Sequence, residues 1–127
     1  MKVGIAGYGV VGKTRHRSIE SNTSYQVTAI SESNKEAQEF IPAGIEVYND
    51  YKSLIANADI DVIFISLPNQ FAAEAACLSL QNGLHVFCEK PPARTHAELL
   101  EVEKQSLKFP ELKLMYGFNH RFHLSVE

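Results

Sequence analysis

Apolar residues in this chain gather in short continuous runs, separated by stretches in which apolar residues have helical spacing. The run VIFISL at 62–67 shows no alternation of apolar and polar residues, which is typical of a strand covered on both faces of a parallel sheet. Between such runs, apolar residues share one face of a helix, as Tyr51, Leu54 and Ile55 do. The pattern predicts strands at 3–6, 26–31, 45–48, 62–67, 85–88 and 113–118. It also predicts one helix that ends near residue 20 and further helices at 35–40, 51–56, 71–81 and 95–107.

Capping and turn residues mark the ends of several predicted helices. Asn34 precedes the second helix, and Thr95 and Glu98 have the spacing of a capping box at the start of the last one. Gly83 is placed to end the fourth helix. Regular alternation of strands and helices implies right-handed crossovers and a mostly parallel sheet. We therefore expect an α/β fold with a doubly wound sheet of about six strands, formed as one domain by residues 1–127.

A glycine motif with G-x-G-x-x-G spacing follows the first predicted strand. Its first glycine permits a tight turn, its second lets a pyrophosphate approach the backbone, and its third lets the following helix pack closely on the strand. The start of that helix offers free N–H groups and a partial positive charge to phosphates. The motif predicts a dinucleotide site of the Rossmann type, the alternative being a turn that binds nothing. The residues predicted to contact the cofactor here are Gly7, Gly9, Val10, Val11 and Gly12.

An acidic residue stands where a dinucleotide site needs one, at the end of the second strand. Glu32 lies 20 residues after Gly12, and its carboxylate can accept hydrogen bonds from both hydroxyls of the adenosine ribose. The alternative is an ordinary exposed acidic residue at a strand end. Ser33 occupies a position where an arginine would help to hold a 2′-phosphate. We therefore expect NAD as the cofactor, rather than NADP.

Charge and composition argue against several classes of partner. Hydrophobic residues make up 45% of the chain and charged residues 21%, as in ordinary globular domains, and the net charge is -3. Nucleic acid and anionic membranes are therefore not expected as partners. The densest basic run contains Lys13, Arg15, His16 and Arg17, and we interpret it as a solvated helix face.

The sequence shows no targeting signal, no run of transmembrane length and no metal-binding pattern. Cys77 and Cys88 lack the C-x-x-C spacing and the paired histidines of metal sites, so we expect buried, reduced thiols and no metal. These features favour a cytoplasmic protein.

An ordered set of motifs spans almost the whole chain. The segments are GIAGYGVVG, AISES, DVIFISLPN, GLHVFCEKPPA and YGFNHRFH. Together they resemble the N-terminal domain of the glucose–fructose oxidoreductase, inositol dehydrogenase and MocA oxidoreductase family. The resemblance implies the nucleotide-binding half of an NAD(P)-dependent oxidoreductase, which oxidises or reduces a sugar, a sugar derivative or another polyol by hydride transfer.

The resemblance also implies roles for residues in the second half of the chain. Leu67 and Asn69 would lie near the nicotinamide ribose, and Glu89 beside the nicotinamide. Lys90 would contact the cofactor and act as the catalytic residue near the reacting hydroxyl, since a lysine in a dry cleft beside a nicotinamide can help to move a proton. The alternative for Lys90 is a solvated lysine at a strand end.

Two departures from the family pattern stand out. Ala72 occupies a position where many relatives have a histidine, which puts a local contact in doubt. Family members also continue into a substrate domain that often forms the oligomer interface, so we expect this chain to be an N-terminal fragment, inactive alone and homo-oligomeric when complete. Three aromatic residues near the end, Tyr116, Phe118 and Phe122, are expected to form an apolar patch that the substrate domain would cover.

Two other functions are compatible with the glycine loop and Glu32. A stand-alone nucleotide-binding or sensing module would need no substrate domain. A methyltransferase would also use a glycine loop and an acidic strand end, but it would give the motifs at Leu67 and Glu89 no role.

Overall fold

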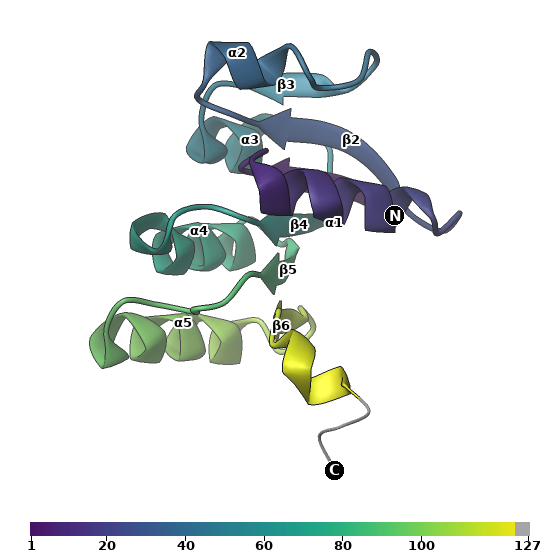
Figure 1. The fold of residues 1–127 in the computed structure, drawn as a ribbon. Coiled ribbons are helices and arrows are strands. Elements are labelled where there is room, and N and C mark those ends of the chain that lie inside the picture. Colours follow the sequence, from purple (N-terminus) through teal and green to yellow (C-terminus); the bar gives the residue numbers. More distant parts are fainter. Residues whose placement is uncertain (124–127) are drawn as a thin grey trace.

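A parallel sheet of six strands forms the centre of the computed structural model, which describes residues 1–123 apart from the side chain of Phe122 (Figure 1). The strands are β1 (Lys2–Ala6), β2 (Gln26–Ser31), β3 (Glu46–Tyr48), β4 (Val62–Ile65), β5 (His85–Cys88) and β6 (Leu114–Tyr116). The helices are α1 (Val10–Glu20), α2 (Lys35–Gln38), α3 (Tyr51–Asn57), α4 (Asn69–Gln81) and α5 (His96–Lys108), followed by a 3-10 helix, η1 (Asn119–Phe122).

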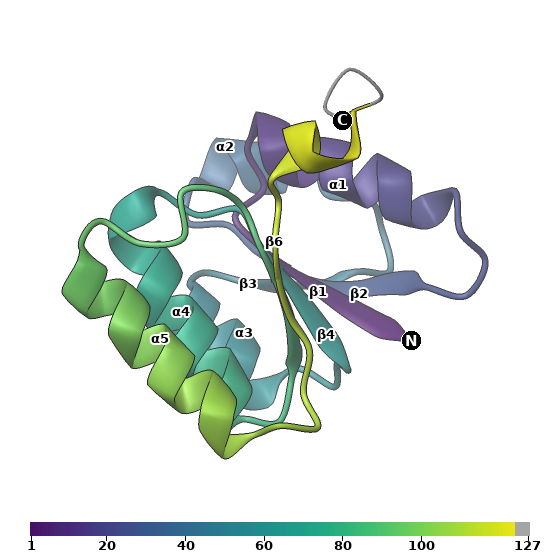
Figure 2. The same cartoon turned by 90° about the horizontal axis from the view of Figure 1, so that it is seen from below.

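The sheet order is β3-β2-β1-β4-β5-β6, with every neighbouring pair parallel. Helices α1 and α2 cover one face, and α3, α4 and α5 cover the other (Figure 2). After β3 the chain returns to the centre, so the strand order reverses between β1 and β4. In open α/β sheets, ligands bind outside the carboxyl ends of the strands at this point. The predicted doubly wound fold is confirmed.

The core consists of two apolar layers, one on each face of the sheet. On the α1 side, Ile5 and Ile30 are fully buried. On the other side, Ile63, Leu80 and Val102 join β4 to α4 and α5. Strands buried on both faces explain why their sequences are continuous apolar runs.

The predicted boundaries hold to within a few residues. Strand β4 ends at Ile65, two residues before the predicted end, and α4 begins at Asn69, two residues before its predicted start. Pro68 forms the N-cap of α4, where a missing N–H costs nothing. Both predicted caps are present: Asn34 Oδ1 accepts from the N–H groups of residues 36 and 37, and Thr95 Oγ1 accepts from that of residue 98.

The predicted aromatic patch is wrong in one part. Tyr116 packs against the α4–α5 side of the core, because it shares a face of β6 with Leu114. Burial raises the pKa of its hydroxyl, which has no hydrogen-bond partner within the described residues. Phe118 is exposed, as predicted, at 51% of its surface. The side chain of Phe122 lies outside the described residues.

The two cysteines are free, and burial raises the pKa of the Cys88 thiol to about 12. Cys77 is only partly buried. Within residues 1–123, no cluster of three His, Cys, Asp or Glu side chains is arranged to hold a metal ion. None of the helices described there has the length and apolar character to cross a bilayer.

Candidate functional site

The glycine loop joins β1 to α1 at the carboxyl edge of the sheet. Gly7 has φ +89°, a left-handed conformation that glycine adopts without strain, and its N–H donates to the carbonyl oxygen of Ser31, 2.9 Å away. A Cβ on Gly12 would lie 2.1 Å from the carbonyl oxygen of Gly7. A Cβ on Gly9 would meet nothing within 4 Å. Gly12 therefore permits close packing inside the protein, whereas Gly9 leaves space on the outside.

Glu32 lies directly after β2, beside this loop. Its carboxylate accepts the N–H of Tyr8 at 3.0 Å and that of Asn34 at 2.9 Å, one on each oxygen. A carboxylate has about four lone-pair sites, so both oxygens retain capacity for hydroxyl donors. The two backbone contacts hold the carboxylate in place between the glycine loop and the start of α2.

A cavity of about 590 Å³ lies between the glycine loop and the ends of β2, β3 and β4. Its volume is in the range of small-molecule and cofactor sites. It brings together four of the predicted residues, Gly7, Gly9, Glu32 and Leu67. The remaining lining residues are Ser31, Ser33, Asn49, Asp50, Tyr51, Ser66, Pro68 and Phe71.

Sequence reasoning missed the contribution of the third strand. Asn49 and Asp50 follow β3 directly and face the same cavity as Glu32. Asn49 Oδ1 accepts from Lys35 Nζ at 2.6 Å and from Gln38 Nε2 at 3.1 Å. Hydrogen bonds from the backbone and hydroxyl of Ser53 lower the pKa of Asp50, the N-cap of α3. The sequence did offer a signal for these two residues, because they follow the predicted third strand and ligands bind at the carboxyl ends of parallel strands.

The other predicted residues lie outside this cavity. Val10 and Val11 expose their side chains on the first turn of α1, with 83% of Val10 accessible. Asn69, also exposed, begins α4. Glu89 and Lys90 follow β5, and the Lys90 side chain is exposed; the peptide bond that joins it to Pro91 is cis.

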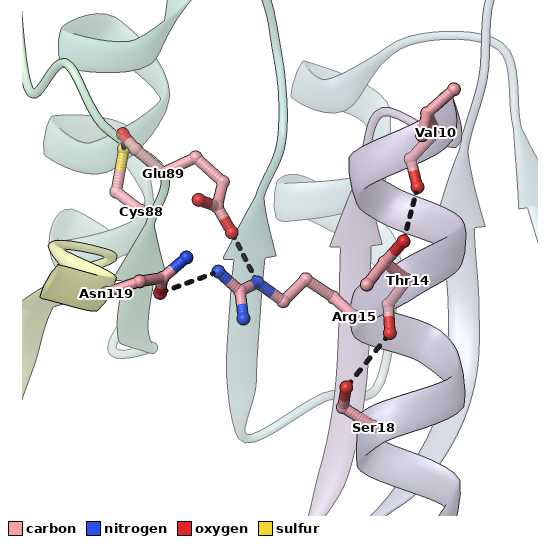
Figure 3. Close-up of polar contacts among 7 residues, drawn as sticks. All are labelled: Val10, Thr14, Arg15, Ser18, Cys88, Glu89 and Asn119. Atoms are coloured by element: carbon pink, nitrogen blue, oxygen red, sulfur yellow. Dashed lines mark hydrogen bonds and ion pairs between the residues drawn. The ribbon is translucent and has the colours of Figure 1, made fainter. Parts of the chain in front are cut away.

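The basic run on α1 is a solvated face only in part: Arg17 is exposed, as predicted, whereas Arg15 and His16 are not. His16 is buried, with its Nδ1 2.7 Å from the Tyr8 hydroxyl and its Nε2 3.2 Å from Glu20 Oε1. Arg15 reaches across the sheet and forms an ion pair with Glu89 (Figure 3). The Arg15 contact joins segments 74 residues apart, and the spacing of residues on one helix could not reveal it.

Residues 1–117 match the model of the oxidoreductase family with an NAD-binding Rossmann fold, the GFO_IDH_MocA family. The chain belongs to this family. The predicted resemblance is thereby confirmed, and with it NAD as the cofactor of the domain. Membership of this oxidoreductase family also excludes the methyltransferase alternative.

Curated members of the family extend well beyond the matched region. Inositol 2-dehydrogenase of Salmonella typhimurium (strain LT2) is 31% identical over 127 residues, which are 96% of this chain and 38% of that protein. D-glucoside 3-dehydrogenase of Escherichia coli (strain K12) is 30% identical over 131 residues, covering all of this chain and 37% of that protein. The chain thus spans little more than a third of the length of these relatives.

Solved structures show the same fold. Scyllo-inositol dehydrogenase from Lactobacillus casei, with bound NAD(H) and scyllo-inositol, superposes with a TM-score of 0.91 at 28% identity, over 98% of this chain and 38% of that one. Myo-inositol 2-dehydrogenase from Lactobacillus plantarum gives a TM-score of 0.92 at 29% identity, with the same coverage.

Proposed function

We propose that this domain supplies the NAD site of a dehydrogenase that acts on a polyol, a sugar or a sugar derivative. The observation that carries the proposal is the cavity at the switch point, where the Glu32 carboxylate stands beside the open backbone at Gly9. NAD supplies the hydride acceptor when it is bound. The substrate class rests on the inositol and glucoside dehydrogenases among the relatives.

The residues divide between the two halves of the cofactor. The backbone at Gly7, Gly9 and the first turn of α1, with Val10, Val11 and Gly12, would hold the pyrophosphate, and Glu32 the adenosine ribose. Because Glu32 lies at the β2 end, the other nucleotide extends toward β4 and β5. In this half we assign Leu67 and Asn69 to the nicotinamide ribose and Glu89 to the nicotinamide.

Lys90 is assigned the catalytic role on the same side. Its ammonium group follows β5 and is exposed in this domain, so it is free to face a substrate. Near the hydroxyl that is oxidised, it would lower the cost of removing the hydroxyl proton. Substrate-binding groups would come from chain beyond the matched region, as the length of the relatives implies. Residues 1–127 alone should then bind NAD without turning over a polyol.

We also infer partners and setting for the complete protein. The net charge of -3 on residues 1–127 favours small-molecule partners over nucleic acid or anionic membranes. We place the complete protein in the cytoplasm, as a homo-oligomer assembled through a substrate domain.

The test compares two lysines in a protein that carries this domain together with a substrate domain. Lys90→Ala should lower kcat strongly while NAD affinity stays within about tenfold, a difference of about 1.4 kcal/mol. Lys104→Ala, which removes an exposed lysine from α5, should leave both unchanged. An unchanged kcat in Lys90→Ala would show that Lys90 is a solvated lysine at a strand end with no catalytic role.

A further inference from the structure

Arg15 and Glu89 form an ion pair between segments 74 residues apart in the chain. Arg15 projects from the middle of α1, and its Nε donates to Glu89 Oε1 just beyond β5 (Figure 3). Its Nη2 donates to Asn119 Oδ1 of η1 at 3.4 Å. The side chains of Arg15 and Glu89 are only 21% and 16% exposed. Solvent and salt therefore screen these two charges less than they screen a fully exposed ion pair.

Packing fixes the geometry of the pair. The Arg15 guanidinium lies over the ring of Phe87, 5.0 Å from its centre, and Phe87 stacks on Phe64 with ring centres 4.9 Å apart. On the other side of the carboxylate, a Cβ at Gly117 would come within 2.8 Å of Glu89 Oε2. The carboxylate is therefore confined between a cation and the backbone of the segment after β6.

The pair lies on the β5 side of the switch point, where the proposed function puts the nicotinamide half of the cofactor. The Glu89 N–H donates to the carbonyl oxygen of Ile65 at 3.0 Å, which continues the pairing of β5 with β4 past the last strand residue. Glu32, which marks the adenosine half, lies on the opposite side of the switch point. The oxidised nicotinamide ring carries a positive charge that the reduced ring lacks. A nearby carboxylate without a counter-charge would thus favour the oxidised form.

We propose that Arg15 is a positioning residue that neutralises Glu89 and thereby sets the relative affinity of the domain for NAD⁺ and NADH. The proposal rests on the proposed function, which puts Glu89 beside the nicotinamide. Because the ratio of the two affinities fixes the reduction potential of the bound cofactor relative to the free one, the pair also sets the driving force for hydride transfer.

The experiment measures dissociation constants for NAD⁺ and NADH on the full chain and its variants. Arg15→Met leaves Glu89 unpaired, so Kd(NADH)/Kd(NAD⁺) should rise by about three- to tenfold. Glu89→Gln leaves Arg15 unpaired, and the ratio should fall. The double variant should return toward the unmodified ratio. Arg17→Met removes the same charge from an exposed position on α1 and should leave the ratio unchanged.

The outcomes separate this proposal from the function on which it rests. If Arg15 had a purely structural role, Arg15→Met would weaken the binding of NAD⁺ and NADH equally. The ratio Kd(NADH)/Kd(NAD⁺) would then stay unchanged, which would overturn the proposal without affecting the proposed function. Should Arg15→Met not fold by circular dichroism, Glu89→Gln must still lower the ratio for the proposal to survive. Failure of the unmodified chain to bind either nucleotide would instead refute the proposed function.

Discussion

Replacing Gly12 with alanine should destabilise the domain, whereas replacing Gly9 should leave its stability almost unchanged. A Cβ on Gly12 would lie 2.1 Å from the carbonyl oxygen of Gly7 and 3.1 Å from its carbonyl carbon. Both are backbone atoms of the loop, so relief requires moving α1 away from β1. Overpacking of this kind costs about 3 kcal/mol, at the upper end of the usual range. A domain of this size should then lose about 10 °C in Tm.

Gly9 is the matched control because it lies in the same loop with open space around it. Its φ of -71° suits alanine, and a Cβ there meets nothing within 4 Å. Alanine is a poorer N-cap than glycine, but it also lowers the conformational entropy of the unfolded chain. These two effects on the free energy of unfolding offset each other to within about 1 kcal/mol. The added methyl would nevertheless block the pyrophosphate, so NAD affinity should fall by more than about tenfold. Thermal unfolding and calorimetric titration measure both effects, and equal Tm values for the two variants would refute this account of the loop.

Two further predictions concern stability. Tyr8→Phe removes the buried hydroxyl that contacts His16 and should lower the free energy of unfolding by about 1–2 kcal/mol. Tyr25→Phe, at a more exposed tyrosine, should change it by less than about 0.5 kcal/mol. Equal losses in thermal unfolding would contradict the role of the Tyr8–His16 contact. Asp50→Ala should lower Tm most at neutral pH: the folded pKa of Asp50 is depressed, so its contribution is present above the ordinary value of about 3.9 and disappears as pH falls through the folded pKa. A loss of Tm that is equal at pH 7 and pH 2.5 would show that the charge contributes nothing.

Local patterns in the sequence were sufficient for much of the fold. The buried strands appear as apolar runs because both faces of the sheet are covered, and the glycine motif indicates where β1 ends and α1 begins. Asn34 and Thr95 indicate where their helices begin, because a cap needs only a side-chain oxygen and the N–H groups of the next few residues. Glu32 could be placed because its distance from the glycine loop is fixed by one helix and one strand.

Contacts between distant segments could not be predicted in this way. The Arg15–Glu89 pair depends on how α1 crosses the sheet, and nothing in the basic run distinguishes Arg15 from its exposed neighbour Arg17. The inward position of Tyr116 was missed because the outer strand was expected to face another domain. Its alternation with Met115, which is 47% exposed, places the tyrosine toward α5 instead.

The central claim is that Glu32 reads the adenosine ribose, and the choice between NAD⁺ and NADP⁺ tests it most directly. A 2′-phosphate about 4 Å from this carboxylate would be repelled by about 4 kcal/mol at an effective dielectric constant near 20, before screening and rearrangement. Lys35, which could offset this repulsion, is hydrogen-bonded to Asn49 instead. The account predicts a lower Kd for NAD⁺ than for NADP⁺ on the unmodified chain, and a shift toward NADP⁺ in Glu32→Ala with Ser33→Arg. Tighter binding of NADP⁺ by the unmodified chain, or no shift in the double variant, would contradict it.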